Sequence, residues 1–233
     1  VAEPGRADLA RSALGEFGAS HFAIWHVDSP MESCFFDLWA FEEAMINVVR
    51  HPELVEHACR RFLERSLDQA RLAARLGAAG CFVEDCMTDM VSPQAFAAFN
   101  VPYARRLVDE IRTLGMQSVY YFCGNPSGKW DLLLSIGADA LSLEESKKGF
   151  DIDIEDVVNR VQGRCAVLGN LDAVGVLQDG SEEQLRAEIR RQIAAGRRNG
   201  NRFVMSIGSP VTPGTPVERV RLYCDLVHEL GRA

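Results

Sequence analysis

Six short apolar runs recur along the chain, and longer stretches with helical spacing separate them. The runs favour strands because most are apolar throughout and rich in Val, Leu and Ile; they cover residues 22–27, 81–83, 119–122, 140–143, 166–168 and 203–207. Strands that are apolar on both faces are typical of parallel sheets covered by helices. The alternation of strands and helices from end to end therefore predicts an α/β fold of repeated βα units.

Helix signals fill the stretches between the strands. Gly77 is a typical helix stop, Pro102 predicts a kink or a division into two helices, and Ser181 opens a capping-box pattern. We expect helices over residues 5–18, 35–49, 53–76, 93–114, 129–136, 154–161, 181–198 and 215–230.

The number of repeated units predicts the architecture. Six βα units are two short of a (β/α)8 TIM barrel, which has roughly 250 residues. No composition shift marks a boundary, so we expect a single barrel domain over residues 1–233 that lacks the first two βα units. The alternative is an open doubly wound sheet, which is disfavoured because no G-x-G-x-x-G follows a strand. An incomplete barrel exposes two sheet edges, which predicts pairing with another chain, such as a homodimer.

Composition excludes several classes of protein. Hydrophobic content of 47% and charged content of 25% are ordinary for a globular domain, and no apolar run approaches the roughly 18 residues of a membrane span. The net charge is −8 and the basic residues are dispersed, so we expect no nucleic-acid partner. Seven cysteines without a C-x-x-C indicate free thiols and a cytoplasmic location.

Polar side chains, thiols and glycines follow the C-terminal ends of the predicted strands. Because these ends meet at one edge of a parallel sheet, they predict one shared site for a small-molecule substrate. The candidates are His26, Asp28, Glu84, Asp85, Cys86, Tyr121, Cys123, Asn125, Glu144, Glu145, Asn170, Asp172 and Ser209.

Three of these residues are candidate catalytic groups. Alternation turns one of Glu84 and Asp85 inward, where a carboxylate can act as a general acid or a metal ligand; the alternative is a capping or solvated acid. Tyr121 could donate a hydrogen bond to a substrate or belong to the core. We assign substrate binding to His26, Asp28, Cys123, Asn125, Asn170, Asp172 and Ser209, although Asn170 and Asp172 could instead make local turn bonds.

The same strand ends carry a metal hypothesis. His26, Glu84 and Cys123, with Cys86 as a further candidate, supply the imidazole, carboxylate and thiolate ligands that zinc takes in proteins. The alternative is that the two cysteines are small buried side chains and that His26 is a hydrogen-bonded core residue.

Four stretches carry a family resemblance. They are Val91–Phe96 with Pro102 and Tyr103; Phe122–Asn125; Leu168–Asp172; and Ser206–Pro210 with Thr215 and Pro216. In this order they resemble the uroporphyrinogen decarboxylase superfamily, which also contains cobalamin and coenzyme M methyltransferases. The resemblance implies a (β/α)8 barrel with its site at the C-terminal mouth.

The resemblance implies two activities. The decarboxylase branch needs no cofactor, but it carries an arginine-rich segment without counterpart here and a Gly-His-Gly where this chain has Gly208-Ser209-Pro210. The methyltransferase branch uses a corrinoid and a zinc held by His-x-Cys and a late Cys, at positions occupied here by Tyr121, Cys123 and Ser209. We expect a decarboxylase acting on a carboxylate-bearing, tetrapyrrole-like substrate. The alternatives are a corrinoid-linked methyltransferase with a degenerate zinc site and an inactive binding barrel.

Overall fold

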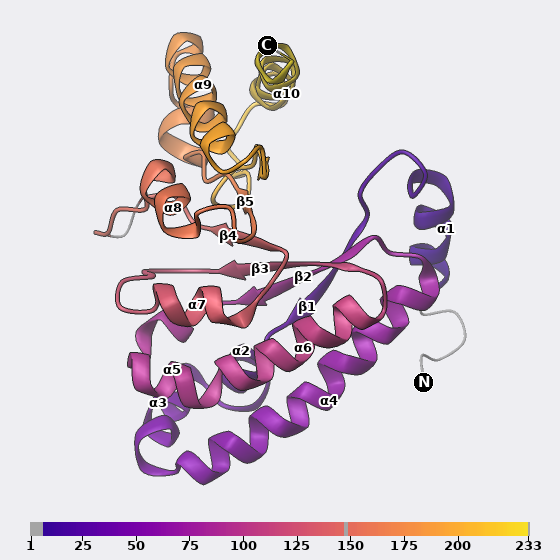
Figure 1. Ribbon diagram of the computed structural model, residues 1–233, viewed down its shortest axis with the longest axis vertical. Helices are drawn as coiled ribbons and strands as arrows, with labels where there is room; N and C mark the ends of the chain where they lie inside the picture. Colours follow the sequence, from indigo (N-terminus) through magenta and orange to yellow (C-terminus); the bar gives the residue numbers. More distant parts are fainter. Residues whose placement is uncertain (1–6, 147–148, 233) are drawn as a thin grey trace. The chain divides into compact units, whose positions relative to one another are not determined.

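Parallel strands alternate with helices throughout the computed structural model, which describes residues 7–146 and 149–232 (Figure 1). The chain divides into two compact units, Val1–Asp139 and Ala140–Ala233. Each unit contributes three strands, and neighbouring strands within each unit pair in parallel. The prediction of six parallel strands in an α/β fold is confirmed.

The first unit is built on β1 (Ile24–Asp28), β2 (Gly80–Asp85) and β3 (Gln117–Phe122), with β2 in the middle. Its helical segments are α1 (Asp8–Phe17), α2 (Pro30–Ser33), η1 (Cys34–Leu38), α3 (Phe41–Arg50), α4 (Pro52–Leu76), η2 (Thr88–Met90), α5 (Pro93–Phe99), α6 (Val101–Thr113) and α7 (Trp130–Ile136).

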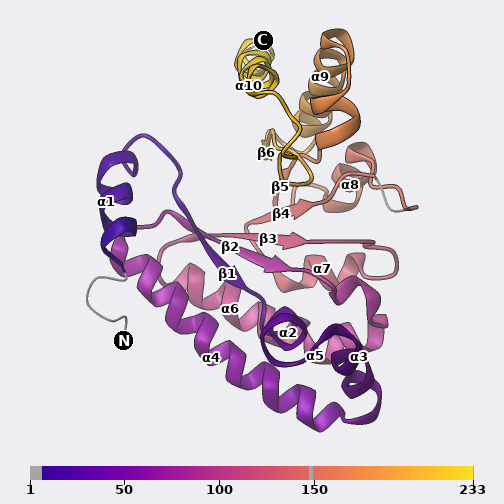
Figure 2. The same cartoon turned by 180° about the vertical axis from the view of Figure 1, so that it is seen from behind.

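Helices α4 and α6 run side by side under one face of this sheet (Figures 1 and 2). Val83, Tyr120 and Phe122 are buried on that face. The opposite face carries a row of rings from three adjacent strands. His26 stacks on Phe82 with ring centroids 6.3 Å apart, and Phe82 stacks on Tyr121 at 5.4 Å. Strand alternation thus separates an apolar core face from a face with polar groups.

Most helix signals place their helices correctly in the structure. Gly77 ends α4 in the left-handed conformation, and Asn100 separates α5 from α6 just before Pro102. The single helix predicted over residues 35–49 is wrong. Ser29 caps α2 five residues earlier, a π-helical turn follows, and the extended conformation of Trp39 and Ala40 separates it from α3.

The second unit contains β4 (Ala140–Leu143), β5 (Ala166–Leu168) and β6 (Phe203–Val204) with α8 (Ile154–Val161), η3 (Ala173–Gln178), α9 (Glu182–Arg198) and α10 (Val217–Gly231). Strand β6 is shorter than the predicted run 203–207. The predicted capping box at Ser181 is present at the start of α9. The core of this unit contains Leu171, Leu177, Leu185, Ile189 and Leu226.

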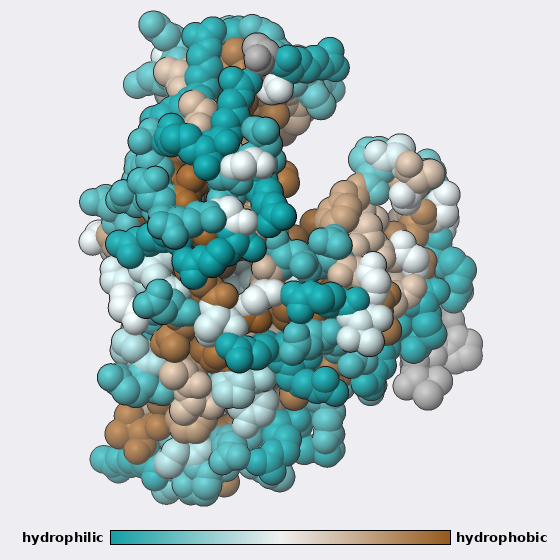
Figure 3. Space-filling view, in the orientation of Figure 1, coloured by the Kyte–Doolittle hydropathy of each residue, from teal (hydrophilic) through white to brown (hydrophobic). Residues whose placement is uncertain are grey.

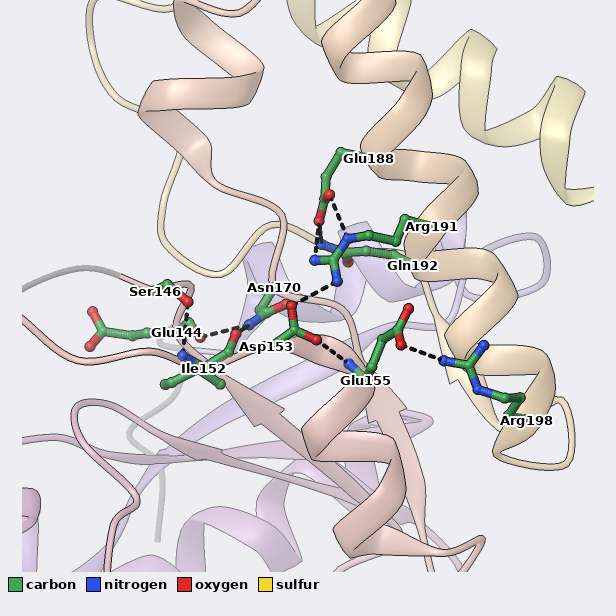
Figure 4. Close-up of polar contacts among 10 residues, drawn as sticks. All are labelled: Glu144, Ser146, Ile152, Asp153, Glu155, Asn170, Glu188, Arg191, Gln192 and Arg198. Atoms are coloured by element: carbon green, nitrogen blue, oxygen red, sulfur yellow. Dashed lines mark hydrogen bonds and ion pairs between the residues drawn. The ribbon is translucent and has the colours of Figure 1, made fainter.

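A guanidinium ties two helices of the second unit together (Figure 4). Arg191 on α9 forms a two-pronged pair with Glu188, at 2.8 and 2.9 Å, and reaches the carboxylate of Asp153 at 2.7 Å. Asp153 is also the N-cap of α8 and accepts a hydrogen bond from the backbone N–H of Glu155. The start of α8 is therefore anchored to the middle of α9.

The buried carboxylate of Asp85 connects the ends of the three strands of the first unit. Asp85 is fully buried and accepts hydrogen bonds from the Ser29 hydroxyl after β1 (2.7 Å), from Asn100 before α6 (2.5 Å) and from the Tyr120 hydroxyl on β3. Burial raises the pKa of Asp85, and the hydrogen bonds from Tyr120 and Ser29 oppose that rise. The network holds the strand ends together on the helix-covered face.

No helix among the described residues is long and apolar enough to span a membrane. In the space-filling view, hydrophilic side chains dominate the visible face and apolar side chains are scattered among them (Figure 3).

Replacing Tyr120 by Phe removes one donor from the buried Asp85 carboxylate. We expect Tyr120→Phe to lower the free energy of unfolding by about 2 kcal/mol, because a hydrogen bond to a charged group is lost without compensation by water. Tyr223→Phe is the matched control, since the Tyr223 hydroxyl is buried without a hydrogen-bond partner in the described part of the chain. Denaturant titrations followed by circular dichroism measure the free energy of unfolding of both variants. Equal losses in Tyr120→Phe and Tyr223→Phe would contradict a stabilising role of the Asp85 network.

Gly196 lies where helix α9 meets Phe203 of β6. A Cβ at this position would overlap the Phe203 ring, so we expect Gly196→Ala to destabilise the protein by about 1–3 kcal/mol through overpacking. Gly15→Ala in α1 is the control, because nothing lies within 4 Å of its added Cβ and helix propensity favours Ala by up to about 1 kcal/mol. The two substitutions should shift the thermal unfolding temperature in opposite directions. A stabilised Gly196→Ala would show that Phe203 and β6 can move to accommodate the added methyl group.

Candidate active site at the strand ends of the first unit

An imidazole and two carboxylates meet on the face of the first sheet opposite Asp85. His26 on β1 contacts the Glu84 carboxylate through Nε2, and its Nδ1 lies 3.7 Å from the carboxylate of Asp28. Alternation explains the placement: Phe82 and Glu84 share one face of β2, whereas Val83 and Asp85 share the other. Of the two predicted acids, Glu84 therefore joins this cluster and Asp85 belongs to the core.

The contact between His26 and Glu84 favours the charged form of both groups. The hydrogen bond to Glu84 raises the pKa of His26, and the same bond from His26 lowers the pKa of Glu84. Burial acts against both shifts, because each side chain is only partly exposed. Both shifts favour the charged pair, and a proton can pass between the two groups along this contact.

Two thiols extend the cluster beyond Glu84. The Cys86 thiol donates to the second oxygen of Glu84, Oε1, at 3.3 Å, and it also forms a hydrogen bond with Cys123. The Cys123 contact, followed by burial, raises the pKa of Cys86. Cys123 follows β3, and its backbone N–H donates to the carbonyl of Asp85 at 3.0 Å. The predicted convergence of Glu84, Cys86 and Cys123 is therefore present, with His26 on the far side of Glu84.

A third acidic residue, Glu32, belongs to the same cluster and was not predicted. Glu32 lies in α2, and its backbone N–H donates to the Ser29 hydroxyl at 3.1 Å. Its side chain is buried, and burial together with the charges of Asp85, Glu84 and Asp28 raises its pKa to about 9. The sequence signal for it is the spacing Ser29-Pro30-x-Glu32, which marks a helix start directly after β1.

The Gly-Asn turn after Cys123 is tied to η2. Gly124 has a φ of +114°, and the Asp89 carboxylate occupies the place where a Cβ would lie. This carboxylate accepts a hydrogen bond from the backbone N–H of Asn125 at 3.1 Å, while the Asn125 side chain accepts one from Ser127 at 3.0 Å. Only glycine fits at position 124, which accounts for the turn sequence.

The remaining candidates belong to the second unit, and two of them make local bonds. The buried Asn170 amide donates to the backbone carbonyls of Glu144 and Ile152, at 3.1 and 2.7 Å (Figure 4). Asp172 caps η3 by accepting hydrogen bonds from two backbone N–H groups. Glu144 and Glu145 are buried, and Ser209 is half-buried. A shared site formed by these residues with Glu84 and Cys123 stays a prediction.

Two groups of side chains in the first unit have metal-ligating composition. In the first, His26, Asp28 and Glu84 place their ligand atoms within 4.8 Å of one another, and Glu32, Glu84 and Cys86 do so in the second. The zinc positions implied by the family resemblance hold Tyr121, Cys123 and Ser209, which offer a phenol, a thiol and a hydroxyl. A phenol and a hydroxyl are not among the Cys, His, Asp and Glu ligands that zinc takes in proteins, so this chain does not reproduce that ligand set.

Comparison with known proteins shows the family. Residues 37–230 match the family model of uroporphyrinogen decarboxylase (URO-D). The chain is 27% identical over 226 residues to the uroporphyrinogen decarboxylase of Desulfotalea psychrophila, covering 97% of this chain and 62% of that protein. It is 23% identical over 128 residues to the methylcobamide:CoM methyltransferase MtbA of Methanosarcina mazei, covering 55% of this chain and 34% of that protein.

Solved structures show the fold. A methyltransferase from Methanosarcina mazei superposes with a TM-score of 0.82 at 21% identity, covering 95% of this chain and 62% of that one. A xylose isomerase-like TIM barrel protein from Mycobacterium smegmatis superposes with a TM-score of 0.50 at 16% identity, covering 99% and 80%. The fold class is thus the TIM-barrel type that the βα repeats predict, and the chain spans less than two thirds of the curated relatives described above.

These matches agree with the four sequence stretches that first carried the resemblance, and the family model covers most of the chain. The chain belongs to the uroporphyrinogen decarboxylase (URO-D) family of enzymes.

Proposed function

We propose that the chain catalyses methyl transfer between a methylcobamide and a small thiol or hydroxyl acceptor. The observation that supports this choice is the composition of the strand-end cluster: Glu32, Glu84 and Cys86 beside His26. Within the described part of the first unit, His26 is the cation paired with Glu84 and Asp28. A substrate with many carboxylates would meet repulsion there, whereas a thiol or hydroxyl would not.

The residues on this face have distinct roles in the proposed reaction. The Glu84 carboxylate, held by His26, would take the proton of the acceptor, whose lone pair would form the new bond to the methyl carbon. A bound methylcobamide would supply the methyl group and would keep the electrons of the broken bond. The stacked rings of Phe82 and Tyr121 form an aromatic wall beside the pair, against which an acceptor can pack. Asp85 supports the strand ends from the other face and does not touch the acceptor.

The second candidate is decarboxylation of a carboxylate-bearing tetrapyrrole without a cofactor. It is supported by the curated decarboxylases of the family, including the relative that aligns with 97% of this chain at 27% identity. In that case the His26–Glu84 pair supplies the proton that replaces the lost carboxyl group on carbon. The two candidates differ in substrate but place the proton transfer at the same residues.

A substitution of His26 tests the proposed proton transfer. We expect the purified chain to demethylate methylcobalamin in the presence of a small thiol, and His26→Gln to reduce the rate by at least about 100-fold because the proton acceptor Glu84 loses the imidazole that holds it and exchanges the proton with it. His21→Gln is the matched control, since His21 is exposed, forms a hydrogen bond with Ser20 and packs against the Phe17 ring. The visible absorbance of the cobamide reports the reaction.

A parallel assay with uroporphyrinogen, analysed by chromatography of the oxidised porphyrins, tests the second candidate. Loss of carboxyl groups from uroporphyrinogen, without demethylation of methylcobalamin, would show that the second candidate is correct and methyl transfer is not the function. Equal rates for the wild type, His26→Gln and His21→Gln in either assay would show that the His26–Glu84 pair takes no part in that reaction.

A further inference from the structure

The Glu32 carboxyl is buried in the strand-end cluster with one of its two oxygens unpaired in the described part of the chain. Glu32 is 6% exposed, and its Oε2 has no hydrogen-bond partner among the described residues. Nearly all buried polar atoms in proteins have a partner, because an unpaired one loses its bonds to water without replacement. An unpaired carboxyl oxygen beside other acids is a position where a cation can find a ligand.

The geometry around Glu32 defines where such a group would lie. The ligand atoms of Glu32, Glu84 and Cys86 are all within 4.8 Å of one another. Ligand atoms bound to one tetrahedral zinc lie roughly 3.3–3.8 Å apart, given bonds of about 2.0–2.3 Å. Small side-chain rotations toward the centre of this triangle therefore suffice to bring the three atoms into one coordination shell.

Glu84 connects this triangle to His26. One carboxylate oxygen, Oε1, accepts from Cys86 at 3.3 Å, and the other, Oε2, contacts His26. A carboxylate that ligates a metal through one oxygen and is held by an imidazole through the other has a fixed orientation. His26 thus acts as a positioning residue for Glu84, and its Nδ1 remains turned toward Asp28.

We propose that Glu32, Glu84 and Cys86 form a binding site for a single divalent cation of the zinc class, with His26 orienting Glu84 from outside the ligand set. A thiolate beside two carboxylates favours Zn²⁺ over Ca²⁺ and Mg²⁺, which take oxygen ligands. The site shares no residue with positions 121, 123 and 209, where the resemblance places the zinc ligands of the methyltransferase branch. The proposal is independent of methyl transfer, because metal binding is measured without substrate.

Metal binding to the whole chain tests the site. We expect the purified protein to bind about one equivalent of Zn²⁺ and, when loaded with Co²⁺ or Cd²⁺, to show a charge-transfer absorption from a single thiolate. Glu32→Gln and Cys86→Ser should each raise the dissociation constant for Zn²⁺ by at least about 100-fold, whereas His26→Gln should raise it about 10-fold as an outer-sphere residue. Competition titrations with a chromophoric chelator provide the constants.

Matched variants distinguish this ligand set from its neighbours. Glu43→Gln and Cys224→Ser alter exposed residues of the same types and should leave Zn²⁺ binding unchanged. X-ray absorption of the zinc-loaded wild type should show one sulfur with nitrogen or oxygen ligands, which keeps the test valid even where a variant fails to fold. Unchanged affinity in Glu32→Gln, or a charge-transfer band lost in Cys123→Ser but kept in Cys86→Ser, would overturn the proposal.

Discussion

The fully buried carboxylate of Asp85 sets the geometry on which the candidate site depends. It joins Ser29 after β1, Tyr120 on β3 and Asn100 before α6, so the ends of three strands are held by one acceptor. Because neighbouring residues of a strand point to opposite faces, fixing Asp85 on the helix side places Glu84 on the other face. There it meets His26 and Cys86. The buried network and the polar cluster therefore both follow from the alternation of side chains along β2.

The sequence was sufficient for the order of elements and for many of their ends. Apolar runs located all six strands, and Gly77, Pro102 and Ser181 marked helix boundaries correctly because these residues act through local backbone chemistry. The helix predicted over 35–49 failed because apolar periodicity continues across Trp39 and Ala40, where the backbone is extended. The choice between Glu84 and Asp85 was equally out of reach, since it depends on which face the helices cover.

The candidate site shows a similar division between local and tertiary information. Strand-end polarity found His26, Glu84, Cys86 and Cys123 together, because parallel strands bring their C-terminal ends to one edge. The same signal selected Asn170 and Asp172, whose side chains bond to the backbone nearby. A polar residue after a strand can cap a helix, brace a turn or face a ligand, and these uses look alike in sequence. Glu32 was missed because its importance comes from burial beside distant acids.

The accumulation of acids at these strand ends needs a physical account. The charges of Asp28, Glu84 and Asp85 all act on Glu32, and Glu32 and Asp85 are buried. Hydrogen-bond donors surround Asp85, and the His26 imidazole contacts Glu84, so both carboxylates have partners. Glu32 has only the backbone N–H of Cys86 beside its carboxyl, and its other oxygen has no partner in the described chain. A glutamine of the same shape would fill that space at lower electrostatic cost. A carboxyl with a free oxygen in this place, beside Glu84 and Cys86, therefore suits the proposed cation site better than a purely structural role.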